Sequence, residues 1–378
     1  MRIAIVGNCH GNIIAQVVRK ALDAEADVDC RHIVNDRRVE EADRAFIDTA
    51  DRVLLQVVDF KGRNAAVTGE NLRPGVVGLF PLIACNFIYP FAGRAHPRSH
   101  ESRSDHCPSG YYEGQSSDSV LMDLMEKHPD EPVEAVVDRY LEVDCARLVD
   151  LDRLYELNRL KMQRIGAAAG LDLWPKIERG FRDAPMFWTY LHPAGGLLRS
   201  LCRHALEQLR LGLTAVAIDT AVDSVREPFG FFHMPIHPSI ARHFGIEWAS
   251  ATYRYRSMPE GAFTIRQFAR RFIRFENCDP VNWAIVSLHA GRDLAAAIDV
   301  LERARQELPD SGDILMNLSV AYWKQGRLPE AMAAATLALE GNPHDADWAL
   351  FVCVIARQMG LLQAGSSLPA KWLADAIP

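Results

Sequence analysis

The chain has 378 residues, of which 49% are hydrophobic and 24% are charged, and its formal net charge is −7. This composition is typical of a globular protein with two or three domains, and the acidic balance argues against a nucleic-acid partner. No apolar run is long enough to span a membrane, and the one behind Arg2 is too short for a signal peptide. The eight cysteines include no C-x-x-C pair, so we expect a cytoplasmic protein without a metal site or a disulfide framework.

The first residues predict a strand, a sharp turn and a helix. Residues 3–6 (IAIV) are short, β-branched and apolar throughout, which indicates a buried parallel strand. Gly7 permits a sharp turn, and apolar residues then recur at helical spacing from Ile13 to Leu22. Cys9 and His10 therefore lie where a first strand ends and a first helix begins, which is where ligands bind in open α/β sheets.

The alternation continues along the first part of the chain. Residues 29–34, 52–58 and 75–80 are further predicted strands, and residues 40–51 form a predicted helix between them. We therefore predict a three-layer α/β/α unit around a parallel sheet, flavodoxin-like in general shape.

Residues 81–117 break this pattern with a long segment rich in Gly, Pro, Ser and His, and such segments are commonly functional. Helical spacing returns over residues 119–128, 133–141 and 147–169. A short strand-like run over 187–191 ends at His192-Pro193, and a helix is predicted over 195–211.

The last hundred residues show a 34-residue period. Pro309 and Pro343 share this spacing, as do Ala297 with Ala331, Ala304 with Ala338, Trp283 with Asn317, and Gly326 with Gly360. This matches the tetratricopeptide pattern, with repeats over about 280–309 and 311–343 and a capping helix over 346–359. These repeats either form a peptide-binding groove or only pack on the main domain.

The residues around the first turn suit nucleophilic acyl transfer. A helix start and a nearby imidazolium both favour a thiolate, so Cys9 is a candidate nucleophile with His10 or His192 as its base. Asn8 and the backbone amides of the turn are candidate oxyanion donors, and Gln56, inside an apolar strand, is a candidate site residue. The structural alternative is that Cys9 only packs under the helix. The same helix start suits an anion, but residues 7–11 form neither a P-loop nor a dinucleotide fingerprint.

Other polar clusters are less specific. The spacing of His96, His100 and His106 with Cys107 fits no standard zinc pattern, so we expect polar loop residues with one of them lining the site. We expect His233 and His237 to be structural, with substrate contact as the alternative. The arginines at 266, 270, 271 and 274 indicate a solvated helix face or phosphate contacts.

Five segments in this order resemble the WcbI-like polysaccharide biosynthesis family. They are the first strand with GNC, then LLQVVDF, GLFPLIACNFIYPFAGRAHP, FWTYLHPAGGLLRSL and MPIHPSIARHFGIEW. The resemblance covers roughly residues 1–275. The resemblance implies a fold related to the SGNH hydrolases and a capsule-type acetyltransferase that binds coenzyme A.

The resemblance also implies roles for single residues. Gly7-Asn8-Cys9 takes the place of the Gly-Asp-Ser nucleophile block, and His192 is the implied general base. His10 stands where the family usually has glutamine, and His96-Pro97-Arg98 lacks the acid that often follows the family's His-Pro. Asp118 is a candidate for the missing third member. Gly7, Asn8, Gln56, His96 and Asp118 form the candidate oxyanion and substrate set, with Gly11 and Asn12 against the cofactor.

We therefore expect an α/β acyltransferase domain over residues 1–275, tetratricopeptide-like repeats over 280–362 and a tail over 363–378. The expected donor is acetyl-coenzyme A, and the acceptor is a hydroxyl of a sugar or polysaccharide precursor, with a possible protein partner at the repeats. Two alternatives remain: an SGNH-type esterase with cysteine as nucleophile, and a non-catalytic scaffold that uses its repeats.

Overall fold

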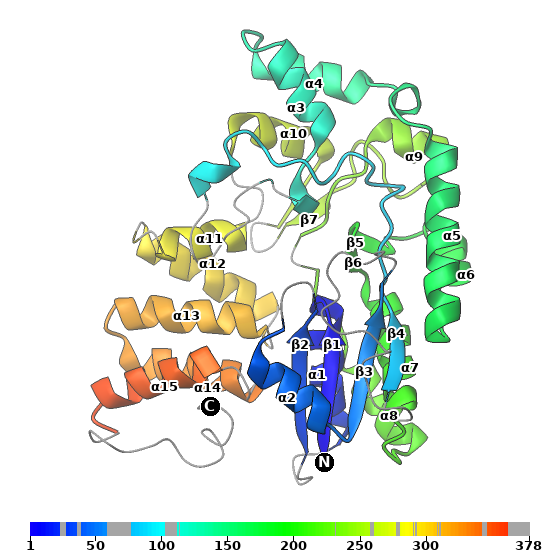
Figure 1. The fold of residues 1–378 in the computed structure, drawn as a ribbon. Helices are drawn as coiled ribbons and strands as arrows, with labels where there is room; N and C mark the ends of the chain where they lie inside the picture. Colours follow the sequence, from blue (N-terminus) through cyan, green and yellow to red (C-terminus); the bar gives the residue numbers. More distant parts are fainter. Residues whose placement is uncertain are drawn as a thin grey trace. The chain divides into compact units, whose positions relative to one another are not determined.

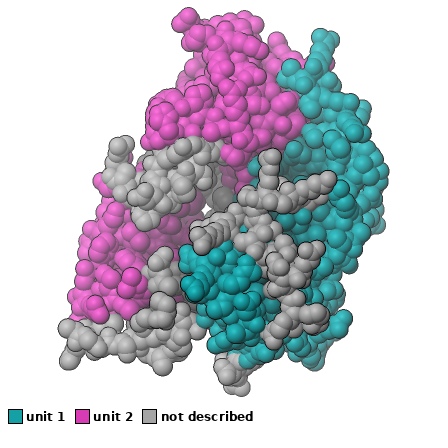
Figure 2. Space-filling model, in the orientation of Figure 1, with its two compact units in different colours: residues 1–88, 145–229, 243–248 teal, residues 89–144, 230–242, 249–378 magenta. Residues whose placement is uncertain are grey.

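The chain divides into two compact units, coloured separately in Figure 2. Unit 1 comprises residues 1–88, 145–229 and 243–248, and unit 2 comprises residues 89–144, 230–242 and 249–378. The computed structural model describes residues 1–22, 28–35, 39–58, 77–102, 112, 114–230, 232–257, 261–276, 280–289, 291, 293–307, 309, 311–341 and 346–361.

Unit 1 is built on a parallel sheet with the strand order β2-β1-β3-β4 (Figure 1). The strands are β1 (Arg2–Gly7), β2 (Asp29–Val34), β3 (Arg52–Val57) and β4 (Val77–Pro81). Residues Ile3 to Val6 have no exposed surface, as expected for a central strand covered on both faces. The predicted parallel α/β sheet is therefore confirmed.

Helices cover both faces of this sheet. Helix α2 (Glu41–Thr49) packs Phe46 and Ile47 against Ala4 and Val6. Side chains alternate along a strand, so Ile5 points to the other face, where it lies against α1 (Cys9–Ala21). Helix α7 (Gly195–Leu209) contacts β3 and β4. Its Gln208 and the β3 side chain Leu54, which points to the same face as Ile5, both lie close to Gly78. These elements make the three layers that the sequence predicts.

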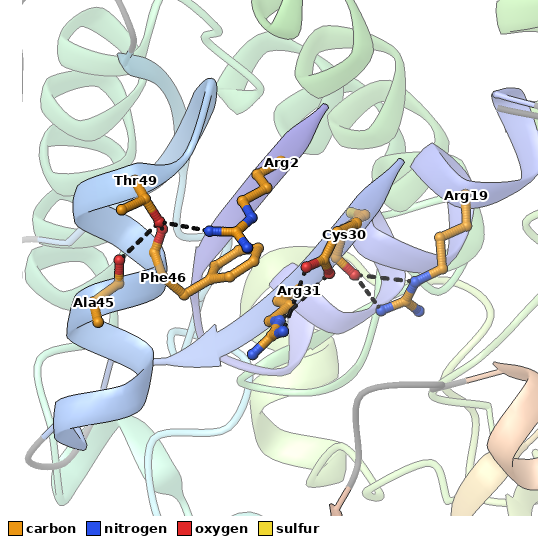
Figure 3. A network of polar contacts seen from close by, with 8 residues as sticks. Arg2, Arg19, Cys30, Arg31, Ala45, Phe46 and Thr49 are labelled. Carbon is orange, nitrogen blue, oxygen red and sulfur yellow. Dashed lines mark hydrogen bonds and ion pairs between the residues drawn. The ribbon is translucent and has the colours of Figure 1, made fainter. Parts of the chain in front are cut away.

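Arginine side chains fix the edge strand β2 (Figure 3). Arg19 of α1 donates to the Cys30 carbonyl at 2.8 and 3.2 Å, which ties the helix to the strand. Arg31 pairs with Asp29 at 3.3 Å, and its guanidinium lies 4.2 Å from the centre of the Phe46 ring. These contacts hold β2 between α1 and α2.

The rest of unit 1 begins with a long helix, α5 (Leu151–Ala169), and a short one, α6 (Trp174–Gly180). The helix predicted from residue 147 starts at Leu151 because the Asp150 side chain accepts a hydrogen bond from the Arg153 amide and caps it. A short antiparallel hairpin follows, β5 (Phe187–Thr189) and β6 (His192–Pro193). Helix α7 ends at Leu209, where Arg210 adopts a left-handed φ of 50°, and α8 (Ala215–Asp223) comes next.

The first part of unit 2 packs three helices together: α3 (Ser119–Lys127), α4 (Val133–Glu142) and α10 (Ile265–Arg274). Two antiparallel strands, β7 (Tyr255–Ser257) and β8 (Gly261–Phe263), precede α10. Helix α9 (Pro238–Phe244) begins in unit 2 and ends in unit 1 along the chain.

The second part of unit 2 is a series of helical hairpins. Its helices are α11 (Pro280–His289), α12 (Leu294–Glu307), α13 (Gly312–Lys324), α14 (Leu328–Gly341) and α15 (Ala346–Gln358). Fully buried alanines, among them Ala297 and Ala331, lie in its core and let the helices approach closely. Gly326 and Gly360, which share the 34-residue period, both adopt a left-handed φ just beyond a helix end.

Candidate active site

The turn between β1 and α1 carries the candidate nucleophile. Cys9 is the first residue of α1, and its side chain is exposed. Asn8 caps the helix: its Oδ1 accepts a hydrogen bond from the His10 amide at 3.0 Å. Gly7 is required because a Cβ there would lie 2.8 Å from Phe80 and 3.1 Å from Gln56. The local fold therefore places an exposed thiol at the carboxyl end of a central parallel strand.

Gln56 holds this turn from the neighbouring strand β3. Its Oε1 accepts from the Asn8 amide at 2.9 Å, and its Nε2 donates to Asn8 Oδ1 at 3.0 Å. Gln56 is only 5% exposed, so these bonds satisfy a buried amide. Because Asn8 Oδ1 accepts from two donors, the side-chain amide of Asn8 has a fixed orientation. Its Nδ2 can then donate to a ligand.

His32 is a site residue that the sequence analysis missed. Its Nε2 lies 2.9 Å from the Asn8 carbonyl and 3.2 Å from the Gly7 carbonyl, so a proton on Nε2 ties β2 to the turn. Gly11 leaves room for it, because a Cβ at residue 11 would meet the His32 ring at 2.8 Å. Gly11 is therefore needed for close packing, and the neighbouring Asn12 is partly buried in the same first turn of α1.

His10 points into the protein from the residue next to Cys9. It has no exposed surface, and its Nε2 lies 3.0 Å from the Leu191 carbonyl. Burial lowers the pKa of His10 to about 4, so the ring is neutral near pH 7. A carbonyl only accepts, so Nε2 carries the proton and Nδ1 keeps a lone pair.

His192 joins this region from the β5–β6 hairpin. Its ring stacks on Phe229 at 4.6 Å between centroids and 11° between planes, and His10 lies 5.8 Å from the same phenyl ring. Burial, with a smaller contribution from His10, lowers the pKa of His192 to about 3. Both imidazoles are thus neutral near pH 7 and can accept a proton, but their lowered pKa values make them weaker bases than a free imidazole.

The hairpin itself is braced by a carboxylate that the sequence analysis also missed. Glu227 Oε2 accepts from Trp188 Nε1 at 2.9 Å and from the Gly195 amide at 2.8 Å. Glu227 therefore connects β5 to the start of α7, on either side of His192. Glu227 and Phe229 lie about 35 residues beyond the end of the hairpin, and no local motif singles them out.

The other two predicted site residues, His96 and Asp118, belong to unit 2. His96 is 1% exposed and stacks on Phe275 at 4.7 Å, and burial lowers its pKa to about 4. Asp118 caps α3 through its Oδ1 and accepts from Tyr140 through its Oδ2 at 2.7 Å, and burial raises its pKa to about 6. Both side chains are thus held within unit 2, and their predicted roles remain predictions.

The arginines of α10 pair with acids rather than forming an open cationic face. Arg270 binds Glu134 of α4 through two nitrogens, and Arg266 binds Asp138 at 2.6 Å. His237 donates from Nε2 to the Tyr140 carbonyl, 2.7 Å away, and is buried, as expected for a structural residue. The predicted loop residues His106 and Cys107 lie outside the described residues.

Within the described ranges, no group of three or more His, Cys, Asp or Glu side chains is placed to hold a metal ion. None of the helices that the structure describes combines the length and apolar character required to cross a bilayer.

The fold and the turn together define an α/β protein with a thiol at the carboxyl edge of a parallel sheet, joined to a helical repeat region. A family model described as polysaccharide biosynthesis enzyme WcbI matches residues 2–214, and a tetratricopeptide repeat model matches residues 288–352. No curated protein matches the chain.

The first match covers more than half of the chain, so the chain belongs to the WcbI family of polysaccharide biosynthesis enzymes. The predicted family and the tetratricopeptide-like repeats are thereby confirmed. A solved structure of WcbI, described as a novel polysaccharide biosynthesis enzyme in a native form without a disulfide bond between coenzyme A and a cysteine, has a similar fold. It aligns with a TM-score of 0.51 and 16% identity over 80% of this chain and 98% of that one.

Proposed function

We propose that this protein is a coenzyme-A-dependent acyltransferase that moves an acetyl group to a hydroxyl of a sugar or polysaccharide precursor. The observation that carries the proposal is the exposed Cys9 at the start of α1, between the fixed Asn8 side chain and His10, with His192 packed on the same Phe229 ring as His10. The solved WcbI structure adds support, because its description relates coenzyme A to a cysteine of that protein.

In this proposal the thiol of Cys9 attacks the carbonyl carbon of the acetyl thioester. His192 takes the thiol proton, the carbonyl oxygen becomes an oxyanion, and Asn8 Nδ2 stabilises it, because the His10 and Gly11 amides already donate to Asn8. The carbon–sulfur bond to coenzyme A then breaks, and the coenzyme leaves as a thiol with the proton from His192. Gly11 and Asn12 are the proposed contacts to the coenzyme.

A second transfer completes the reaction. The acceptor hydroxyl attacks the acetyl-cysteine, His192 removes its proton, and the Cys9 thiol is regenerated as the ester product forms. In the direct route, the acceptor attacks the thioester itself and Cys9 only orients it. The Cys9→Ala variant separates the routes, because only the direct route survives it.

The test is a thiol-release assay with acetyl-coenzyme A and a panel of sugar acceptors. A stoichiometric burst of coenzyme A release without acceptor, followed by turnover that needs an acceptor, with both lost in Cys9→Ala, supports the covalent route. Cys353→Ala is the matched control, because Cys353 is a partly exposed cysteine on α15. Ester hydrolysis without acceptor or coenzyme would favour the esterase alternative, and a stable protein complex without turnover would favour the scaffold.

The remaining assignments complete the proposal. We place the acyltransferase domain at residues 1–275 and the repeats, as the contact for a protein partner, at 280–362. His96 and Asp118 are carried as proposed substrate contacts. The proposed compartment is the cytoplasm, where Cys85, Cys145 and Cys202 stay reduced as buried apolar side chains.

A further inference from the structure

We infer that His10 is a positioning residue: its Nε2–H holds the Leu191 carbonyl and thereby fixes the hairpin that carries His192. The inference rests on the proposed function only where it takes His192 as the base. It assigns the role of general base to His192 rather than His10, a choice that the sequence leaves open.

The direction of the His10 hydrogen bond is fixed by its partner. The Leu191 carbonyl oxygen accepts only, and it lies 3.0 Å from Nε2, so the single proton of the neutral ring is on Nε2. This bond joins residues that are 181 positions apart in the sequence. It connects the second residue of α1 to the turn of the hairpin, one residue before His192.

Phe229 and His10 then fix two different features of His192. The phenyl ring stacks nearly parallel on the imidazole and sets the plane of the ring. The bond from His10 fixes the position of the backbone at Leu191, the residue before His192. Together they register the hairpin against the helix start that carries Cys9.

Accessibility separates the roles of the two histidines. A general base must approach the proton it removes directly or through one water. His10 has no exposed surface, whereas His192 is partly exposed.

The test compares two substitutions at the same position. In His10→Gln a side-chain amide N–H can still donate to the Leu191 carbonyl, but it does not titrate. In His10→Met the volume is similar and no donor remains. Backbone hydrogen exchange over residues 187–193 and the pH profile of kcat/KM are measured for both, with His192→Gln as the base-deficient control.

We expect exchange over the hairpin to be roughly five- to tenfold faster in His10→Met, as for one lost hydrogen bond, and close to wild type in His10→Gln. His10→Gln should keep most of the activity and the wild-type pH profile, whereas His192→Gln should lose both. Unchanged exchange in His10→Met, or a His10→Gln variant as inactive as His192→Gln, would overturn the inference. If the wild-type protein transfers no acetyl group, the proposed function fails, and the exchange experiment still decides whether His10 holds the hairpin.

Discussion

Replacing Gln56 with leucine should loosen the turn that presents Cys9. Leucine fills a similar volume on β3 but removes both bonds to Asn8. Each neutral hydrogen bond contributes about 0.5–1.5 kcal/mol, so the pair contributes roughly 1–3 kcal/mol. For a domain of about 150–250 residues, the middle of that range lowers the melting temperature by roughly 4–8 °C.

Gln56→Glu is the sharper companion variant. Its carboxylate still accepts from the Asn8 amide, but it places a second acceptor against Asn8 Oδ1. Asn8 cannot rotate its amide to donate without losing the bond from the His10 amide. We therefore expect Gln56→Glu to be destabilised as well, although the shape of the side chain is unchanged.

Thermal melts followed by circular dichroism and acetyl-transfer rates measure these effects. Gln16→Leu is the matched control, because Gln16 is a partly buried glutamine on α1 outside the Asn8 network. A displaced turn should also lower kcat by up to about 10²-fold. A Gln56→Leu protein that melts within roughly a degree of wild type and keeps its rate would show that Gln56 does not hold the turn.

Three further results are expected. The pKa of His10 is about 4 in the folded protein, against an unperturbed value of 6.5. As the pH drops, the unfolded chain therefore takes up this proton before the folded protein does. The free energy of unfolding falls by up to about 3 kcal/mol between pH 6.5 and pH 4. The His10→Gln variant should lack this contribution to acid destabilisation. Parallel curves of unfolding free energy against pH for wild type and His10→Gln would contradict the prediction. Glu227→Ala should lower the free energy of unfolding in urea by about 1.5–3 kcal/mol, because it removes a carboxylate that accepts from Trp188 and from the start of α7. Glu227→Gln should lower it by less, and an equal loss in both variants would argue against this role. Ala331→Leu should lower the melting temperature of the repeats, because an overpacked core costs about 1–3 kcal/mol, whereas Leu337→Ala on the exposed face should change little.

Local patterns predict the sheet and the repeats well. The apolar run of residues 3–6 and the helical stripe after Gly7 are signals within one element, and the structure has β1 and α1 there. The pair Gly326 and Gly360 marks the repeat period because each residue adopts a left-handed φ at a helix end. Such features depend on neighbours in the sequence.

The site depends on contacts between distant segments, and these leave no local signal. The partner of His10 is a backbone carbonyl at Leu191, which any residue type could supply. His32 reaches the turn only because β2 pairs with β1 in register. Asp118 is different: it precedes a predicted helix start, so its capping role could be predicted from the sequence.

In the proposed function, the Cys9 turn binds a coenzyme A thioester. Calorimetric titration of the purified protein with acetyl-coenzyme A, coenzyme A and ATP, in parallel with Cys9→Ala, tests it most directly. We expect micromolar binding of both coenzyme A compounds and none of ATP. Absence of coenzyme A binding, with the protein shown to be folded, would contradict it.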